Sequence, residues 1–229
     1  LTIPGGVEAA RRIVIDTARA NGRDDAYLRL IVSRGEGALG VDPTTCTNPR
    51  IVCIADQVRL YPEEKLRRGI DLVTSSLRKS PPDVLDPRVK SLNYLNNALA
   101  KQEAHRQGAD EALLLTAAGQ VAEASVANVI AERAGRLLTP PASDGALEGL
   151  TRDTVLQLAG EQRIPAEERT LGRFDLLAAE EVFLTGSGAR IVAVGSLDGL
   201  GIGKGGPGPI TRGLCQTFEQ CVRSTGTPI

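Results

Sequence analysis

The sequence contains no methionine and no tryptophan, and aromatic residues make up only 3% of its 229 residues. So few aromatic side chains leave little material for stacking nucleic-acid bases. Acidic and basic residues nearly balance, and the formal net charge of −1 argues against a strongly basic nucleic-acid-binding protein. Without methionine, the sequence is expected not to begin at a natural start codon, and its core is expected to consist of Leu, Val, Ile and Ala.

Histidine occurs once, at His105. One histidine cannot build a multi-histidine metal site, and no GxSxG motif accompanies it to indicate a serine nucleophile. We therefore expect no bound metal. The cysteines form no CxxC pair and lack the spacing of metal ligands, so they are interpreted as reduced thiols of a cytoplasmic protein. They are Cys46, Cys53, Cys215 and Cys221.

Long hydrophobic runs are also missing. No segment approaches the ~18 apolar residues that span a bilayer, and the first residues, LTIPGGVEAARR, lack the apolar core of a signal peptide. We therefore expect neither a membrane nor a nucleic acid as a partner. With 41% hydrophobic and 24% charged residues, the composition is that of a folded globular protein.

The order of the predicted elements favours an α+β or α/β protein with two domains. The prolines of residues 79–83 (KSPPD) restrict the backbone and mark the best linker. We expect a small α+β domain over residues 1–80, a linker over 81–88 and a larger domain over 89–229. Apolar periodicity and turn residues predict helices at 7–20, 93–107 and 210–223 and a short helical turn at 62–64. They predict strands at 26–34, 51–58, 69–76, 111–116, 121–124, 126–132, 136–139, 181–185 and 190–194.

Four segments contain residues that are unusual for a purely structural role. Lys90 precedes a helix in DPRVKSLNYLNN, and Glu123 ends a strand in GQVAEASVANVI. LEGLTRDTV leads into a predicted helix with Thr151 as its N-cap, and FLTGSGARI forms a turn of small residues. Helix N-termini and such turns present free backbone N–H groups to anions. Thr151, Thr185 and Ser187 add hydroxyl donors to these two anion sites.

These parts suit pyridoxal-phosphate chemistry, which needs an amine nucleophile, an acid beside the pyridine nitrogen and a phosphate cup. Lys90 and Glu123 are candidates for the first two roles. Each part also has a structural interpretation. A lone lysine at a helix start is usually solvated, a lone glutamate beside a turn usually lies at the surface, and a threonine at a helix start is usually only a cap. Their joint occurrence in this order favours the catalytic interpretation.

The same segments resemble the fold-type IV pyridoxal-phosphate enzymes, the class IV aminotransferases. The likeness is strongest in KSLNYLNN, EASVANV, LEGLTRDTV and EVFLTGSGA, and it extends over nearly the whole chain. The resemblance implies a two-domain fold, with a small N-terminal α+β domain whose upstream part is missing and a larger C-terminal domain of mixed sheet with helices. It also implies a homodimer.

The resemblance implies a role for each matching residue. Lys90 is implied to carry pyridoxal 5'-phosphate and to move the proton at the substrate Cα, and Glu123 to bind the pyridine nitrogen. Tyr94 matches, across a one-residue gap, the tyrosine that hydrogen-bonds the phenolic oxygen of the cofactor. The remaining implied contacts are to the cofactor from Leu147, Leu150, Thr151, Gly186 and Ser187, and to the substrate carboxylate from Gly188 and Ala189.

Within this family, the first half of the chain most resembles the branched-chain amino acid aminotransferases. The segment YLR is similar to their Tyr-x-Arg strand motif, and strand alternation puts Tyr27 and Arg29 on one face, where both can meet a substrate. The segment LGV is similar to the loop that reaches the neighbouring subunit's site. Gly40 and Val41 of this loop are therefore further candidates for substrate binding.

Two departures from the family pattern concern arginines. The phosphate-binding arginine of the family precedes Leu1, and Arg11 and Arg12 do not match it. Arg190 stands where the branched-chain type usually has a glutamate, which leaves the substrate open.

The expected activity is transfer of an amino group from an amino acid of the branched-chain type to a 2-oxo acid. The alternatives are a D-amino-acid or amine transaminase, a 4-amino-4-deoxychorismate lyase, a non-catalytic or inactive remnant of the fold, and a simple binding module.

Overall fold

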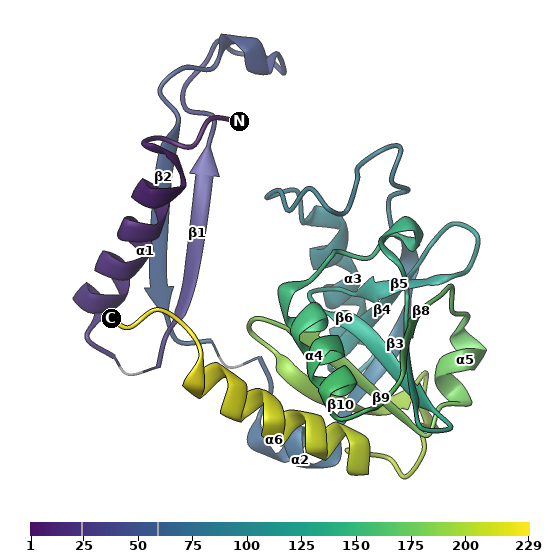
Figure 1. Ribbon diagram of the computed structural model, residues 1–229. Coiled ribbons are helices and arrows are strands. Elements are labelled where there is room, and N and C mark those ends of the chain that lie inside the picture. Colours follow the sequence, from purple (N-terminus) through teal and green to yellow (C-terminus); the bar gives the residue numbers. More distant parts are fainter. Residues whose placement is uncertain (24, 59) are drawn as a thin grey trace. The chain divides into compact units, whose positions relative to one another are not determined.

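The computed structural model describes residues 1–23, 25–58 and 60–229 (Figure 1). The chain divides into two compact units, Leu1–Arg59 with Thr227–Ile229, and Leu60–Gly226. Each unit is built on its own sheet. Among the described residues, no helix has the length and apolar character needed to cross a membrane. The four cysteines are free thiols.

The first unit consists of one helix on a two-stranded sheet. Helix α1 (Gly6–Asn21) packs against strands β1 (Tyr27–Ser33) and β2 (Arg50–Asp56), which pair in antiparallel fashion over their whole length. The loop between the strands contains one turn of 3-10 helix, η1 (Pro43–Thr45). The helix and both strands predicted for this part of the sequence are confirmed.

The second unit is a nine-stranded mixed sheet with helices packed on it (Figure 1). In chain order its elements are α2 (Glu63–Arg68), β3 (Ile70–Arg78), α3 (Leu95–Arg106), β4 (Glu111–Leu115), β5 (Val121–Ala124), β6 (Asn128–Arg133), β7 (Arg136–Thr139), η2 (Ala142–Asp144), α4 (Leu150–Glu161), β8 (Ala166–Glu168), α5 (Arg173–Leu177), β9 (Glu181–Gly186), β10 (Arg190–Leu197), β11 (Leu200–Gly201) and α6 (Pro209–Ser224).

The strands of this sheet run in the order β5-β4-β3-β10-β9-β6-β7-β8, with β11 on β10. Strand β3 is parallel to both of its neighbours, and β7 is parallel to β8, whereas the other pairs are antiparallel. The predicted helices and strands of this part are confirmed. Four elements were not predicted, namely η2, β8, α5 and β11, because each has five residues or fewer and shows no usable periodicity.

The division of the chain falls earlier than the predicted linker at residues 81–88. Strand β3 lies in the middle of the large sheet, where Ile70 and Leu72 are fully buried, so residues 60–80 belong to the second unit. The prolines of residues 79–83 instead mark the point where the chain leaves this sheet. Local sequence could not assign β3 to a sheet, because the partner strand β10 lies far along the chain.

Strands β4 and β9 are buried on both faces. On β9, Val182 and Leu184 belong to one hydrophobic cluster, whereas Phe183 belongs to another that includes residues of α4 and α6. On β4, Ala112 and Leu114 pack against α3. Burial on both faces accounts for the uninterrupted apolar runs in these two strands. The same burial holds in place the ends of these strands, and the candidate site lies near the end of β9.

Candidate functional site

Glu123 lies near the end of β5 and is only 7% exposed. Its Oε2 accepts a hydrogen bond of 2.9 Å from the backbone N–H of Leu147, and its Oε1 accepts one from Nζ of Lys79. The side chains of Lys79 and Glu123 are 14% and 9% exposed, so the ion pair is largely shielded from water. The glutamate predicted to lie beside a turn is therefore a buried carboxylate, which excludes the surface interpretation.

Leu147 connects this carboxylate to the next strand. Its carbonyl oxygen accepts a hydrogen bond of 2.7 Å from Nδ2 of Asn128, the first residue of β6. Asn128 is paired in the sheet with Thr185 of β9. Three of the four segments that the sequence singled out, EASVANV, LEGLTRDTV and EVFLTGSGA, therefore meet at one place.

The N-terminus of α4 lies beside Asn128. A Cβ atom built on Gly149 would lie 2.1 Å from Oδ1 of Asn128, so only glycine fits there without a rearrangement. The helix begins at Leu150 with Gly149 as its N-cap. The prediction of Thr151 as N-cap was wrong, because Thr151 is already the second residue of the helix.

No side chain among the described residues caps α4, so its first N–H groups stay available. Such groups, together with the helix dipole, attract anions. Thr151 is 9% exposed and Leu150 is 82% exposed. The start of α4 therefore presents backbone donors beside a largely buried threonine.

The end of β9 supplies another hydroxyl. Thr185 is fully buried, and its Oγ1 has no hydrogen-bond partner among the described residues. A buried hydroxyl without a partner is unfavourable by about 1–3 kcal/mol, so this atom is a candidate donor to a ligand. In the turn that follows, Ser187 is exposed, Gly186 and Gly188 are half-buried, and Ala189 is buried.

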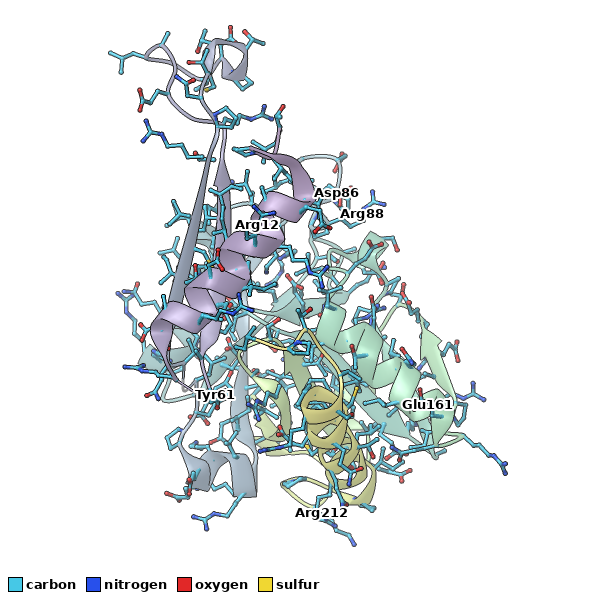
Figure 2. The ribbon with its side chains drawn as sticks, turned by 60° about the vertical axis from the view of Figure 1, so that its left-hand side comes forward. Arg12, Tyr61, Asp86, Arg88, Glu161 and Arg212 are labelled. Carbon is cyan, nitrogen blue, oxygen red and sulfur yellow. The ribbon has the colours of Figure 1, made fainter. Side chains whose placement is uncertain are left out.

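Lys90 lies in the loop that joins β3 to α3. Its Nζ donates a hydrogen bond of 3.1 Å to the hydroxyl of Tyr94, and both residues are exposed. Among the contacts of the described residues, none joins Lys90 to Glu123 or Thr151. Two residues before Lys90, Arg88 donates to Asp86, and this hydrogen-bonded ion pair lowers the pKa of Asp86 to about 2 (Figure 2).

Both ends of this loop are held close to Glu123. Nδ2 of Asn96 donates to the carbonyl of Arg78, the residue before Lys79, at 3.0 Å. Nδ2 of Asn97 donates at 2.7 Å to the carbonyl of Ser125, two residues after Glu123. Asn96 and Asn97, the last two residues of KSLNYLNN, therefore fasten the first turn of α3 to the end of β3 and to the residue that follows β5.

The predicted substrate residues of the first unit lie on β1 and in the loop after it. The guanidinium carbon of Arg29 lies 6.0 Å from the centre of the Tyr27 ring, so these two side chains share one face as the alternation predicted. Gly40 and Val41 lie in the exposed loop between β1 and β2.

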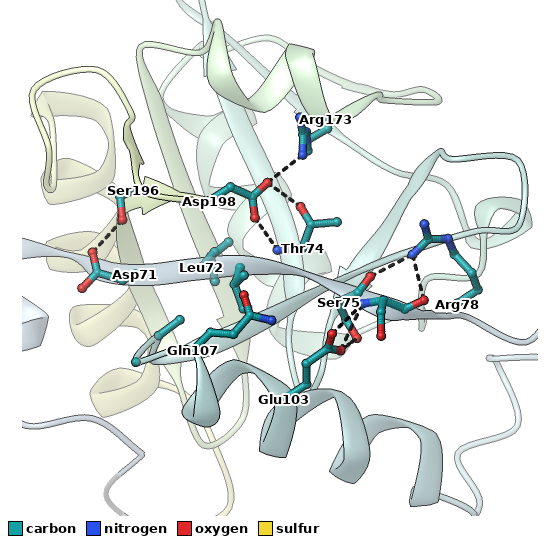
Figure 3. Close-up of a pocket in the computed structure, with 15 residues that line it drawn as sticks. Asp71, Leu72, Thr74, Ser75, Arg78, Glu103, Gln107, Arg173, Ser196 and Asp198 are labelled. Atoms are coloured by element: carbon teal, nitrogen blue, oxygen red, sulfur yellow. Dashed lines mark hydrogen bonds and ion pairs between the residues drawn. The ribbon is translucent and has the colours of Figure 1, made fainter.

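A separate pocket of about 660 Å³ opens along β3, between the end of α3 and α5 (Figure 3). None of the predicted site residues lines it. Its carboxylates already have donors, since Asp198 accepts from the Thr74 hydroxyl at 2.8 Å and from Arg173 at 2.9 Å, and Glu103 accepts from the Ser75 hydroxyl at 2.5 Å. The segments that the motifs single out meet around Glu123 and not at this pocket, so the buried carboxylate of Glu123 is the stronger candidate.

Sequence reasoning missed two residues of the site. Lys79 was interpreted as part of a linker, and Asn128 was not singled out. Asn128 gave a partial signal, because an asparagine that begins a buried strand calls for a specific contact, and the glycine of LEGLTRDTV does lead into a helix as expected. Nothing local indicated that Lys79 pairs with a strand more than forty residues away.

Comparison with known proteins gives consistent matches. The family model for amino-transferase class IV matches residues 1–197. A Methanocaldococcus jannaschii protein assigned to the branched-chain-amino-acid aminotransferases is 43% identical over 219 residues, which cover 96% of this chain and 75% of that protein. The branched-chain-amino-acid aminotransferase of Escherichia coli is 35% identical over 205 residues, covering 89% of this chain and 66% of the enzyme.

Solved structures agree with these sequence matches. The crystal structure of the Escherichia coli branched-chain enzyme superposes with a TM-score of 0.92 at 32% identity, covering 96% of this chain and 73% of that one. The branched-chain amino acid aminotransferase of Thermobaculum terrenum, solved in its PLP form, gives a TM-score of 0.82 at 32% identity and covers 93% and 69% of the two chains.

Proposed function

Since this chain belongs to the class IV aminotransferases, we propose that it is a pyridoxal-phosphate-dependent transaminase that moves the amino group of a branched-chain amino acid to a 2-oxo acid. One observation carries the proposal. A buried carboxylate, a helix N-terminus whose N-cap is a glycine, and a buried hydroxyl without a partner in the described part of the chain meet at the ends of three neighbouring segments.

The residues present fit pyridoxal 5'-phosphate. Thr185 offers a buried hydroxyl that lacks a partner within the described chain, which suits a phosphate oxygen. Thr151 and the backbone N–H group of Leu150 add donors, with Gly186 at the end of β9 and Ser187 in the turn after it. Leu147, whose N–H already donates to Glu123, is assigned to the cofactor as the residue that orients this carboxylate. Glu123 suits a protonated ring nitrogen, because a negative charge beside it favours the cationic form. When bound, the cofactor supplies an electron-withdrawing ring that makes the substrate Cα proton acidic.

Lys90 is the proposed catalytic base. Its amine holds the cofactor covalently and, once released, takes the proton from the substrate Cα and returns it to the carbon that receives the amino group. Tyr94 donates to the phenolic oxygen of the cofactor. The support for this pair is the 3.1 Å contact between Lys90 and Tyr94 and the fastening of both loop ends beside Glu123.

Residues of two further segments are proposed to recognise the substrate. Gly188 and Ala189 lie in the turn after β9 and are assigned to the substrate carboxylate. Tyr27 and Arg29 share one strand face and are assigned to the rest of the substrate. The branched-chain side chain is supported by the names of the relatives, of whose length this chain spans 75% and 66%.

A homodimer and a cytoplasmic location are also proposed. Leu39 and Val41 are fully exposed apolar residues in the loop between β1 and β2, which supports the assignment of Val41, with Gly40, to a neighbouring subunit's site. Four free cysteines support a reducing compartment.

The proposed activity is tested with a panel of L- and D-amino acids and with 2-oxoglutarate and pyruvate as acceptors. We expect turnover of L-leucine, L-isoleucine or L-valine. Turnover of D-amino acids alone, or release of product without an acceptor, would instead indicate a D-amino-acid transaminase or a lyase. Borohydride reduction and peptide mapping should place the pyridoxyl group on Lys90. Label on Lys79 or Lys101 would contradict this assignment.

A further inference from the structure

Lys79 is held firmly in the candidate site although it follows a strand that ends one residue earlier. Its backbone N–H donates to the carbonyl of Leu115 at 2.9 Å, and its Nζ reaches across β4 to Oε1 of Glu123. The side-chain stem passes directly over Gly145, where a Cβ atom would lie 3.0 Å from Cγ of Lys79. The position of this ammonium group is therefore fixed by backbone pairing and packing.

The acceptor capacity of Glu123 is not exhausted by its two donors. A carboxylate has about four lone-pair positions, and within the described residues Glu123 accepts only from Lys79 and Leu147. Glu111 gives the contrast, because it is fully buried and accepts from Lys101, Tyr61, Ser125 and the N–H of Ala112. The first carboxylate can take a further donor, whereas the second is saturated.

Two cations therefore compete for one carboxylate when a protonated pyridine ring binds at Glu123. One is the resident Lys79 ammonium, and the other is the ring nitrogen with its proton. Like charges that share a shielded site repel each other, and the repulsion is stronger there than in water. The ion pair seen in the structure thus bears directly on how the ring is held.

We propose that Lys79 is a positioning residue that serves as the resident counter-ion of Glu123 and weakens the hold of this carboxylate on the cationic ring nitrogen of the cofactor. The inference rests on the proposed function. It adds a residue whose positive charge opposes protonation of the ring nitrogen. The protein therefore stabilises the protonated ring less than Glu123 alone would. Lys79 also holds the carboxylate of Glu123 oriented against the N–H of Leu147 before the cofactor arrives.

The test compares two probes, pyridoxal 5'-phosphate and its 1-deaza analogue, in which a C–H group replaces the ring nitrogen. Only the first can place a cation beside Glu123. The dissociation constants of both probes are measured for the parent protein and for Lys79→Met, which keeps the stem and removes the charge. We expect the preference for pyridoxal 5'-phosphate over the analogue to rise about tenfold in Lys79→Met, equivalent to about 1.4 kcal/mol. Lys79→Arg keeps the cation and should keep the parental preference.

Three further variants test whether a change in preference comes from the charge of Lys79 acting through Glu123. Lys101→Met removes the lysine of the saturated pair and should leave the preference unchanged. Lys79→Gln removes the charge while retaining a donor, and should raise the preference if Lys79→Met fails to fold in a thermal melt. In a Glu123→Gln background, removing the Lys79 charge should change the preference much less.

The outcomes distinguish failure of the counter-ion role of Lys79 from failure of the proposed transaminase function. If the parent protein binds both probes and Lys79→Met or Lys79→Gln keeps the parental preference, the counter-ion role is overturned while the proposed function stands. If the parent protein binds neither probe, the proposed function fails, and the counter-ion role fails with it.

Discussion

Gly149 and Asn128 lie in such close contact that a Cβ atom on the glycine would lie 2.1 Å from Oδ1 of the asparagine. The φ angle of Gly149 is −83°, which any residue adopts, so the requirement for glycine is steric. The same asparagine holds the carbonyl of Leu147 through its Nδ2. One small residue thus lets the start of α4 approach β6.

Gly149→Ala should therefore disturb both the strand and the helix start. Overpacking of this kind costs about 1–3 kcal/mol, and we expect the affinity for pyridoxal 5'-phosphate to fall at least about tenfold, since the helix donors move. Urea unfolding and a cofactor titration measure the two effects. Gly160→Ala, on the same helix with open space around it, is the matched control and should stabilise the protein by about 0.5–1 kcal/mol. Parental stability and affinity in Gly149→Ala would contradict the steric account.

Glu123→Gln should slow the half-reaction between an amino acid and the bound cofactor. A neutral amide cannot stabilise a protonated ring nitrogen as a carboxylate does, and a loss of about 2 kcal/mol of transition-state stabilisation is about thirtyfold in rate. Single-turnover absorbance measures the rate. Glu161→Gln, on the exposed end of α4, is the control. A parental rate in Glu123→Gln would show that this residue does not act on the ring.

Thr185→Val should raise the stability of the protein and weaken its binding of pyridoxal 5'-phosphate. Removing a buried hydroxyl without a partner should raise the free energy of unfolding by about 1 kcal/mol. Loss of a hydrogen bond to a charged phosphate, worth about 1.5–3 kcal/mol, should weaken pyridoxal 5'-phosphate binding at least about tenfold. Thr211→Val is the matched control, because Thr211 has the same kind of buried hydroxyl on α6. It should stabilise the protein without weakening binding. Equal binding by both variants would place the phosphate elsewhere.

Glu132 should make stability depend on pH. Burial raises the pKa of this carboxyl, and the charges of Glu180 and Glu181 raise it further, while the N–H of Gly135 partly offsets the shift. With a raised pKa the folded state binds the proton more tightly than the unfolded state, so stability falls as pH rises through the interval between the two pKa values. Glu132→Gln should therefore gain stability relative to the parent between pH 4 and pH 7. The urea unfolding midpoints of both proteins are measured across this range. A difference between the two midpoints that does not change with pH would contradict the prediction.

Features set by residues close together in the sequence could be predicted, whereas features set by pairing between distant segments could not. The helices of residues 6–21 and 209–224 follow from periodicity, and the choice of Glu123 and of the two candidate anion-binding segments follows from motifs and family resemblance. The linker was misplaced because proline marks a local break, whereas the membership of β3 depends on pairing with β10. Residue type alone favours Thr151 as the N-cap, because it carries no information on the contact between Asn128 and Gly149 that sets the start of the helix. Lys79 could not be predicted, since its partner is chosen by the strand order β5-β4-β3.

The loop that carries Lys90 has both ends fastened, by Asn96 at Arg78 and by Asn97 at Ser125. A chain segment whose ends are already held together has lost most of its closure entropy, and the remaining cost grows only slowly with its length. Tying its middle to a group that Glu123 and α4 hold divides one closed ring into two smaller ones. The covalent attachment proposed for Lys90 would therefore act on the loop as a removable cross-link, and much of the ordering that it needs is already provided by Asn96 and Asn97.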